Sequence, residues 1–156
     1  MTIRQPKQRP LQLEDASKRD VRTQFGALCW RVKNGTLQVL LITSRRSRRW
    51  IIPKGWPMDQ QTPADAAKTE AWEEAGVEGT ASPVCLGIFS YRKELDPGET
   101  LPCIVAVFPV KVKSLSKDYP EKSDRRRRWF NSKKAAKLVE EPELATMIKN
   151  FDPSKI

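Results

Sequence analysis

The chain has 156 residues, a formal net charge of +10, no histidine and three cysteines. This length suits one domain with a sizeable core, and we expect a partly disordered basic arm over residues 1–20 and a single domain over residues 21–152. Cys29, Cys85 and Cys103 lie in apolar runs without paired spacing, which favours buried free thiols in a reducing compartment over a disulfide framework. Without histidine or a CxxC motif, nothing in the sequence indicates a zinc site. The sequence therefore favours a cytoplasmic protein with no signal peptide and no membrane-spanning segment.

The first third of the chain alternates β-prone apolar runs with turn signals. Asn34 and Gly35 form a strong hairpin signal. The predicted elements are a strand over Thr23–Val32, the Asn34-Gly35 turn, a strand over Leu37–Thr43, a basic turn over Ser44–Arg49, a short strand over Trp50–Ile52 and a loop over Pro53–Gln61. Within this loop, Gly55 lets the backbone approach a ligand closely.

A helix is predicted over Pro63–Ala75. Thr62 is its candidate N-cap, Pro63 suits the first helical position, and Asp65 completes a capping-box-like pattern. Gly76 can end the helix in a left-handed conformation. Both ends of this helix therefore carry local signals.

The second half of the chain returns to strands and ends in helices. The predicted elements are strands over Val84–Lys93 and Leu101–Val112 joined by a turn over Asp96–Glu99, a polar loop over Ser114–Asp124, a strand over Arg125–Phe130, a helix over Lys133–Glu140 and a last helix from Pro142 to about Asn150. Pro109 predicts an edge position or a bulge in its strand, and Ser132 is a candidate helix cap. This order of elements predicts an α/β fold in which helices pack against a mixed sheet.

Three carboxylates stand together on the predicted helix. Glu70, Glu73 and Glu74 occupy positions i, i+3 and i+4, which share one helix face with Cβ atoms roughly 5–6 Å apart. Like charges at this spacing repel each other. A hard divalent cation such as Mg²⁺, which prefers oxygen ligands, would turn the repulsion into a binding site.

Basic residues flank this acidic segment on both sides. They form two runs, Arg45, Arg46, Arg48 and Arg49 before it and Arg125 to Arg128 after it. Guanidinium groups bind phosphate oxygens bidentately, so the pattern favours an anionic polyphosphate as substrate. A solubilising surface or a nonspecific nucleic-acid patch is the other interpretation of these runs.

The stretch from Gly55 to Val77 resembles the Nudix box of the Nudix hydrolases, whose pattern is G-x5-E-x7-R-E-U-x-E-E-x-G-U with U a bulky aliphatic residue. The matching residues are Gly55, Glu70, Glu73, Glu74, Gly76 and Val77. Gln61 replaces a Glu of the pattern, Thr69 replaces an Arg, and Ala71 is small for its position. The first two differences are consistent with a neutral loop–helix pair in place of an ion pair. The resemblance implies an α/β/α sandwich that buries the Ala66/Ala67 side of the helix.

Outside the box, the chain is similar to the diphosphoinositol polyphosphate and diadenosine polyphosphate phosphohydrolases within this family. The similarity rests on Thr43-Ser44-Arg45 before Trp50, on Gly87-Ile88-Phe89, and on Arg125–Arg128 before Trp129. It implies that Thr43, Ser44, Arg45 and Arg125 contact substrate phosphates. Lys54 stands at a position that is Gly in some members, where its charge could add a phosphate contact or narrow the cleft.

The resemblance also implies a chemistry for the box. Glu70, Glu74 and the Gly55 carbonyl would bind Mg²⁺ or Mn²⁺, and Glu73 would be a further ligand or the general base of a pyrophosphohydrolase. A 5′-polyphosphate RNA pyrophosphohydrolase and a non-catalytic domain that binds polyphosphate or nucleic acid remain the alternatives. RNA is thus a second possible partner, no membrane partner is expected, and the sequence does not predict the oligomeric state.

Overall fold

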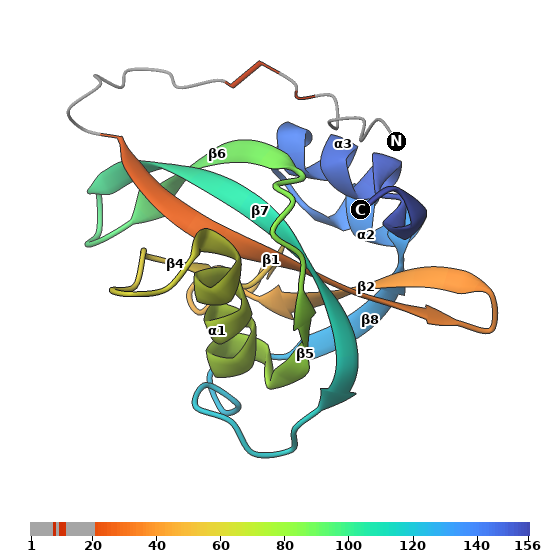
Figure 1. Ribbon diagram of the computed structural model, residues 1–156. Coiled ribbons are helices and arrows are strands. Elements are labelled where there is room, and N and C mark those ends of the chain that lie inside the picture. The colour runs from red at the N-terminus through yellow and green to blue at the C-terminus, as the bar shows by residue number, and fades with distance from the viewer. Residues whose placement is uncertain (1–7, 9, 12–20) are drawn as a thin grey trace.

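Strands between Arg22 and Asn131 join one mixed sheet with helices on both faces (Figure 1). The structure is a computed structural model, and it describes Gln8, Pro10, Leu11 and residues 21–156. The strands are β1 (Arg22–Lys33), β2 (Thr36–Thr43), β3 (Trp50–Ile51), β4 (Lys54–Gly55), β5 (Val77–Ala81), β6 (Gly87–Glu94), β7 (Thr100–Leu115) and β8 (Arg127–Asn131). The helices are α1 (Pro63–Ala75), α2 (Ser132–Leu138), α3 (Pro142–Asn150) and the short 3₁₀ turn η1 (Pro153–Lys155).

The parallel pair of β1 and β7 forms the centre of the sheet. Its register runs from Arg22 opposite Cys103 to Trp30 opposite Lys111. The main strand order is β3-β2-β1-β7-β5, while β4 pairs with β1, β6 with β7 and β8 with β2. All of these other pairs are antiparallel. The sheet is therefore mixed, as predicted.

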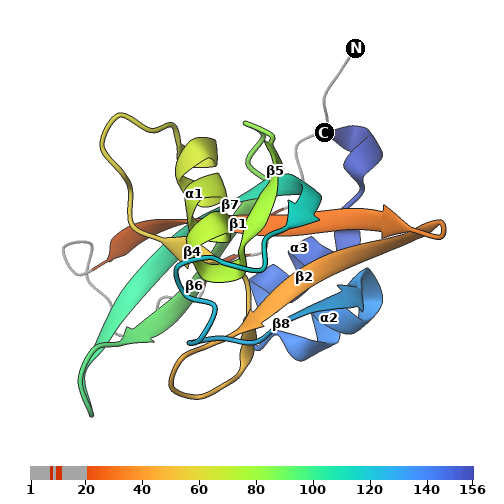
Figure 2. The same ribbon diagram turned by 90° about the horizontal axis from the view of Figure 1, so that it is seen from below.

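Helices lie on both faces of the sheet, as the turned view in Figure 2 shows, and each face carries an apolar layer. On one face, the alanines of α1 pack against β1 residues such as Ala27 and Cys29. On the other face, α2 and α3 pack against β1 residues such as Leu28 and Trp30. Because neighbouring residues of β1 point to opposite faces, one strand serves both layers. The predicted α/β/α sandwich is confirmed.

The strongest local signals gave the right elements. Asn34 and Gly35 have φ angles of 51° and 74°, as a hairpin turn of this kind requires. The predicted helix over Pro63–Ala75 is α1 itself, and α3 begins at Pro142 and ends at Asn150 as expected.

Two strands were not predicted. β4 lies inside the expected Pro53–Gln61 loop, and its Gly55 pairs with Phe25 of β1. β5 follows α1 directly and pairs with the end of β7. Both are short and carry no apolar run, so that only their pairing with a long central strand makes them extended.

The prediction for Pro109 was wrong, because β7 is an interior strand at this point. Pro109 pairs with Leu28 of β1 on one side, and its carbonyl accepts the Ser82 amide on the other. Since the N–H and C=O of a strand residue point the same way, the missing N–H of proline faces the gap where β7 changes partner from β6 to β5. The proline therefore removes no hydrogen bond from the central pair.

Smaller differences occur near the chain ends. Asn131 occupies the N-cap position of α2 without a side-chain capping bond, so Ser132 is the first helical residue and not the cap. The predicted arm lies outside the described residues apart from Gln8, Pro10 and Leu11, and Gln8 exchanges two hydrogen bonds with the backbone of Ile88. Within the described part of the chain, no helix is both long and apolar enough to cross a bilayer.

Candidate active site

Helix α1 carries the predicted carboxylates and is fixed at both ends. The Thr62 hydroxyl accepts the Asp65 amide at 3.1 Å, and Gly76 has a φ of 67° at the C-terminal end. The Arg127 guanidinium donates to the Ala75 carbonyl at 2.8 Å, which places a cation at the negative end of the helix dipole. The helix is therefore held from both the preceding loop and β8.

Glu70 lies directly against the backbone of β4. A Cβ atom on Gly55 would stand 2.2 Å from the Glu70 carboxylate carbon, so only glycine leaves room for this side chain. Burial raises the pKa of Glu70 to about 7, and the negative charges of Glu74 and Glu73 contribute to this rise. The group that approaches Gly55 closely in this structure is thus the Glu70 side chain, a predicted metal ligand.

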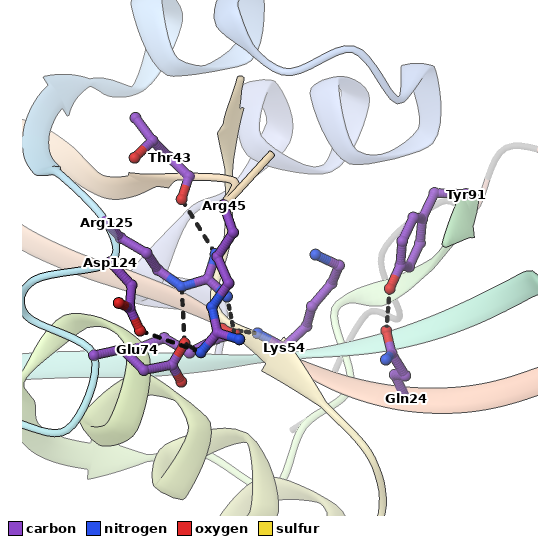
Figure 3. A network of polar contacts seen from close by, with 9 residues as sticks. Gln24, Thr43, Arg45, Lys54, Glu74, Tyr91, Asp124 and Arg125 are labelled. Carbon is purple, nitrogen blue, oxygen red and sulfur yellow. Dashed lines mark hydrogen bonds and ion pairs between the residues drawn. The ribbon is translucent and has the colours of Figure 1, made fainter. Parts of the chain in front are cut away.

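Glu74 is the most buried of the three carboxylates. Its side chain accepts the Lys54 amide at 3.4 Å and lies 3.5 Å from the Arg125 guanidinium. Burial raises its pKa to about 7, while the nearby charges of Arg125 and Lys54 oppose that rise. Glu74 therefore joins α1, β4 and the loop before β8 in one polar cluster (Figure 3).

Arg125 is the centre of this cluster. Its guanidinium donates to the Thr43 carbonyl at 3.1 Å and to Glu121 at 3.2 Å, in addition to its contact with Glu74. Thr43 is buried, and its hydroxyl accepts the Arg126 amide at 2.9 Å. The end of β2 is thereby fixed to the residues that precede β8.

Arg45 lies above the same cluster but is exposed. Its guanidinium pairs with Glu121 and, at 3.4 Å, with Asp124 (Figure 3). Ser44 beside it hydrogen-bonds to Ser47 at 2.8 Å and accepts the Arg49 amide at 3.1 Å. The basic turn is therefore ordered by its own hydroxyl groups.

A cavity of about 430 Å³ opens between these residues. Its wall is mostly basic, and among the described residues its two acidic ones are Glu74 and Glu94. The lining residues are Gln24, Ser44, Arg45, Arg46, Ser47, Arg49, Ile51, Lys54, Glu74, Tyr91, Arg92, Lys93, Glu94, Leu95 and Arg125. We call this space the basic cavity.

The basic cavity brings together most of the predicted substrate-binding residues. Ser44, Arg45, Lys54 and Arg125 line it, whereas Thr43 supports its wall from behind. Among the described residues, Glu70 and Glu73 lie on the same helix as Glu74 but outside the lining. Of the second basic run only Arg125 contributes: Arg127 caps α1, and Arg128 lies over Phe130.

Lys54 projects from β4 toward Tyr91 on β6. Its Nζ lies 4.7 Å from the centre of the Tyr91 ring, and the Tyr91 hydroxyl donates to Gln24 at 2.6 Å (Figure 3). Burial lowers the pKa of Lys54 to about 8, although the charge of Glu74 opposes this. The lysine is thus a cation held over an aromatic face inside the basic cavity.

Sequence reasoning missed Gln24 and Lys93 as lining residues. Gln24 is 2% exposed within an apolar strand, and such a buried polar residue was the available signal. Lys93 had no signal of its own.

Gln61 and Thr69, the two residues that differ from the Nudix box pattern, contact each other. The Thr69 hydroxyl donates to the Gln61 side-chain oxygen at 3.1 Å, which confirms the predicted neutral loop–helix pair.

The donor groups around Gly55, Glu70 and Glu74 suit a divalent cation. All are oxygen donors, and the negative charges of Glu74 and Glu73 contribute to the raised pKa of Glu70. In the described part of the chain, no group of three acidic, thiol or imidazole side chains forms a complete metal cage. Mg²⁺ does not need one, because it is usually held by one or two carboxylates together with substrate phosphates and water.

The fold and the site define an α/β sandwich in which a carboxylate-bearing helix adjoins a basic cavity. The sequence model of the NUDIX domain matches residues 22–151, and the chain belongs to this family.

Relatives of this chain are named as hydrolases. It is 34% identical over 120 residues to Nudix hydrolase 13, mitochondrial, of Arabidopsis thaliana, covering 74% of this chain and 59% of that protein. It is 29% identical over 134 residues to human diphosphoinositol polyphosphate phosphohydrolase 3-alpha, covering 85% and 77% of the two chains. The chain spans only 59% and 52% of the length of two Arabidopsis relatives.

A solved structure supports the fold. The C. elegans Ap4A hydrolase binary complex superposes with a TM-score of 0.57 at 19% identity, covering 82% of this chain and 93% of that one. At this identity the likeness concerns the fold alone.

Proposed function

We propose that the protein is a metal-dependent hydrolase of phosphoanhydrides, which cleaves a diphosphate joined to another moiety. Diadenosine polyphosphates and inositol pyrophosphates are the candidate substrates. The human relative is named for the second of these two classes. The observation that carries the proposal is the basic cavity, where Lys54 and Arg125 lie beside the Glu74 carboxylate of the box helix.

The cations of the cavity would hold the phosphate chain. Arg45 is exposed, so a phosphate oxygen can replace Asp124 or Glu121 as its partner. Lys54 also lines the cavity and adds a second charge. These residues would place the anhydride beside α1 and stabilise negative charge on its non-bridging oxygens.

Glu70, Glu74 and the Gly55 carbonyl would hold Mg²⁺ or Mn²⁺. When bound, the cation would supply positive charge to the reacting phosphates. Glu73 would take a proton from the attacking water at its carboxylate. The water oxygen then forms a bond to one phosphorus, the anhydride P–O bond breaks, and the other phosphate leaves with the electron pair.

The test is product analysis by ion-exchange chromatography, with and without Mg²⁺. Diadenosine polyphosphates, an inositol pyrophosphate, nucleoside triphosphates and 5′-triphosphorylated RNA would be offered to the wild type and to Glu73→Gln and Glu74→Gln. We expect metal-dependent cleavage of a small-molecule substrate, with turnover at least about tenfold lower in each variant, because each loses a proton acceptor or a charge at the reacting centre.

Glu78→Gln is the matched control, since Glu78 is an exposed glutamate just beyond the same helix. Its turnover should equal that of the wild type. Wild-type rates in Glu73→Gln and Glu74→Gln would remove these residues from the site. Preferred cleavage of RNA, or tight polyanion binding without any cleavage, would replace the proposal by one of the two alternatives.

A further inference from the structure

A second cavity of about 380 Å³ adjoins the basic cavity and shares Arg49, Tyr91 and Arg92 with it. Its far wall is acidic and comes from the start of α3. The residues of this wall are Glu140, Glu141, Pro142 and Glu143. We call it the acidic wall. The two neighbouring cavities therefore have walls of opposite charge.

Glu141 is the informative residue of the acidic wall. It is 8% exposed, and its Oε1 atom accepts a hydrogen bond from Arg49 at 2.6 Å. Its Oε2 atom is buried, and no donor from the described residues reaches it. A buried carboxylate oxygen without a hydrogen-bond donor is energetically unfavourable. The ion pair with Arg49 satisfies only one of the two carboxylate oxygens of Glu141.

Glu143 lines the same cavity from the first turn of α3. It is 5% exposed, and its Oε1 atom accepts from Ser90 at 3.4 Å, a long hydrogen bond. The start of a helix favours acidic side chains, which explains why glutamates occur here. The helix end does not explain why two of them are buried against a cavity that continues into a cluster of arginines.

The acidic wall lies within electrostatic reach of the basic cavity. Burial lowers the pKa of Lys54, and Glu141 is among the charges that oppose this lowering. Arg49, Tyr91 and Arg92 line both cavities, so a ligand whose phosphates lie in the basic cavity can extend past these residues to Glu141.

We propose that Glu141, with Glu143, determines substrate specificity by accepting hydrogen bonds from the hydroxyl and amino groups of a nucleoside whose polyphosphate lies in the basic cavity. This inference rests on the proposed function. A ribose and an adenine present O–H and N–H donors, and hydrogen bonds to a carboxylate are strong. An inositol ring that carries further phosphates would place negative charge against the same carboxylates, which disfavours it. The acidic wall thus selects dinucleoside polyphosphates over inositol pyrophosphates.

The test compares kcat and KM of the wild type and Glu141→Gln for diadenosine tetraphosphate and for an inositol pyrophosphate, with Mg²⁺ present. Glutamine keeps the size of the side chain and can still accept from Arg49, but it removes the charge. We expect the wild type to prefer the dinucleotide. In the variant, KM for the dinucleotide should rise about tenfold, as the loss of one charge-assisted hydrogen bond predicts, and KM for the inositol pyrophosphate should fall.

Inorganic tripolyphosphate separates specificity from a structural role, because it carries no nucleoside. Its inhibition constant should be the same in the wild type and in Glu141→Gln. An equal change for tripolyphosphate and dinucleotide would mean that Glu141 acts only by holding Arg49, and it would overturn the inference. Glu78→Gln is again the matched control, since Glu78 is exposed and lines neither cavity.

The remaining outcomes also decide the question. A wild type that prefers the inositol pyrophosphate, or an unchanged preference in Glu141→Gln, overturns the inference and leaves the proposed function standing. A wild type that cleaves neither substrate overturns both. Thermal unfolding checks that the variant is folded. If it is not, Glu143→Gln takes its place and should also raise KM for the dinucleotide, whereas an unchanged KM counts against the proposal.

Discussion

At the scale of single residues, the site depends on a glycine that makes room for a carboxylate. Gly55 pairs with Phe25 of β1, and this pairing fixes its backbone against the Glu70 side chain. The space at Gly55 therefore determines where one of the proposed metal ligands stands.

Replacing Gly55 with alanine should displace the Glu70 carboxylate while the protein remains folded. The new Cβ would meet the end of a flexible side chain, which can turn away more easily than backbone can. Turnover should fall at least about tenfold, because small misplacements at a reacting centre have large effects on rate. The measurement is kcat for Gly55→Ala, Glu70→Gln and the double variant. Losses that simply add would show that Gly55 acts independently of Glu70.

The two arginines of the cluster differ in burial, and their removal should differ accordingly. Arg125 and Glu74 have side chains that are 11% and 6% exposed, whereas the Arg45 side chain is 57% exposed. Arg125→Gln would remove the cation that forms an ion pair with the buried Glu74 and should lower the free energy of unfolding by roughly 3 kcal/mol. Arg45→Gln should lower it by less than about 1 kcal/mol. Urea unfolding of both variants makes the comparison, and equal losses would contradict the central role of Arg125.

At the scale of elements, α1 lies close to the sheet because its buried side is made of alanines. Ala67, Ala71 and Ala75 are fully buried, and they pack against β1 and β7. Small side chains allow the helix to approach the strands, and the approach brings Glu70 to β4. Ala71, which is small for its position in the Nudix box, therefore contributes to the packing of α1 against the sheet.

A larger residue at this position should push the helix outward. Ala71→Leu adds volume to a filled layer and should destabilise the protein by roughly 1–3 kcal/mol. Lys68→Leu, on the exposed side of the same helix, should change stability by less than about 0.5 kcal/mol. Denaturant unfolding measures both variants. A stable Ala71→Leu protein would mean that the layer has spare room.

At the scale of the whole molecule, the chain has a formal net charge of +10, although the proposed site itself contains carboxylates. Long-range attraction of a polyanion toward such a surface weakens as salt screens it. We therefore expect kcat/KM for an anionic substrate to fall roughly tenfold between about 0.05 and 0.5 M salt, while kcat changes little.

Steady-state kinetics at several salt concentrations test this expectation. Lys33→Gln, at the β1–β2 hairpin, should keep the same salt dependence, because it removes one exposed charge that does not line the basic cavity. A kcat/KM that is independent of salt would show that only short contacts within the cavity attract the substrate.

The parts of the molecule that could be predicted are those with local signals. Asn34-Gly35, Thr62-Pro63 and Gly76 each determine a turn or a helix end through their own backbone preferences, and the elements beside them were predicted correctly. The glutamates of α1 could be placed on one face from spacing alone. β5 could not be predicted, because Glu78 to Ala81 carry no apolar alternation and become a strand only through β7.

The acidic wall was also beyond sequence reasoning. Arg49 and Glu141 are far apart in the chain, and each alone is an ordinary charged residue. Their contact depends on α3 packing under the sheet beside β6, which no local pattern specifies. The prediction for Pro109 failed for a similar reason. The missing N–H of this proline costs no hydrogen bond only because β7 changes partner at this point, and that change depends on the whole sheet.

The central pairing of β1 with β7 has a consequence for synthesis of the protein. β1 leaves the ribosome early, but Thr100, where β7 begins, follows after most of the other strands. Until then the nascent chain can pair β1 only with β2 and β4 and must close a long loop before its core forms, a feature that slows folding. A chain that stalls before Thr100 would therefore expose an unpaired edge of β1, open to association with other unfinished chains.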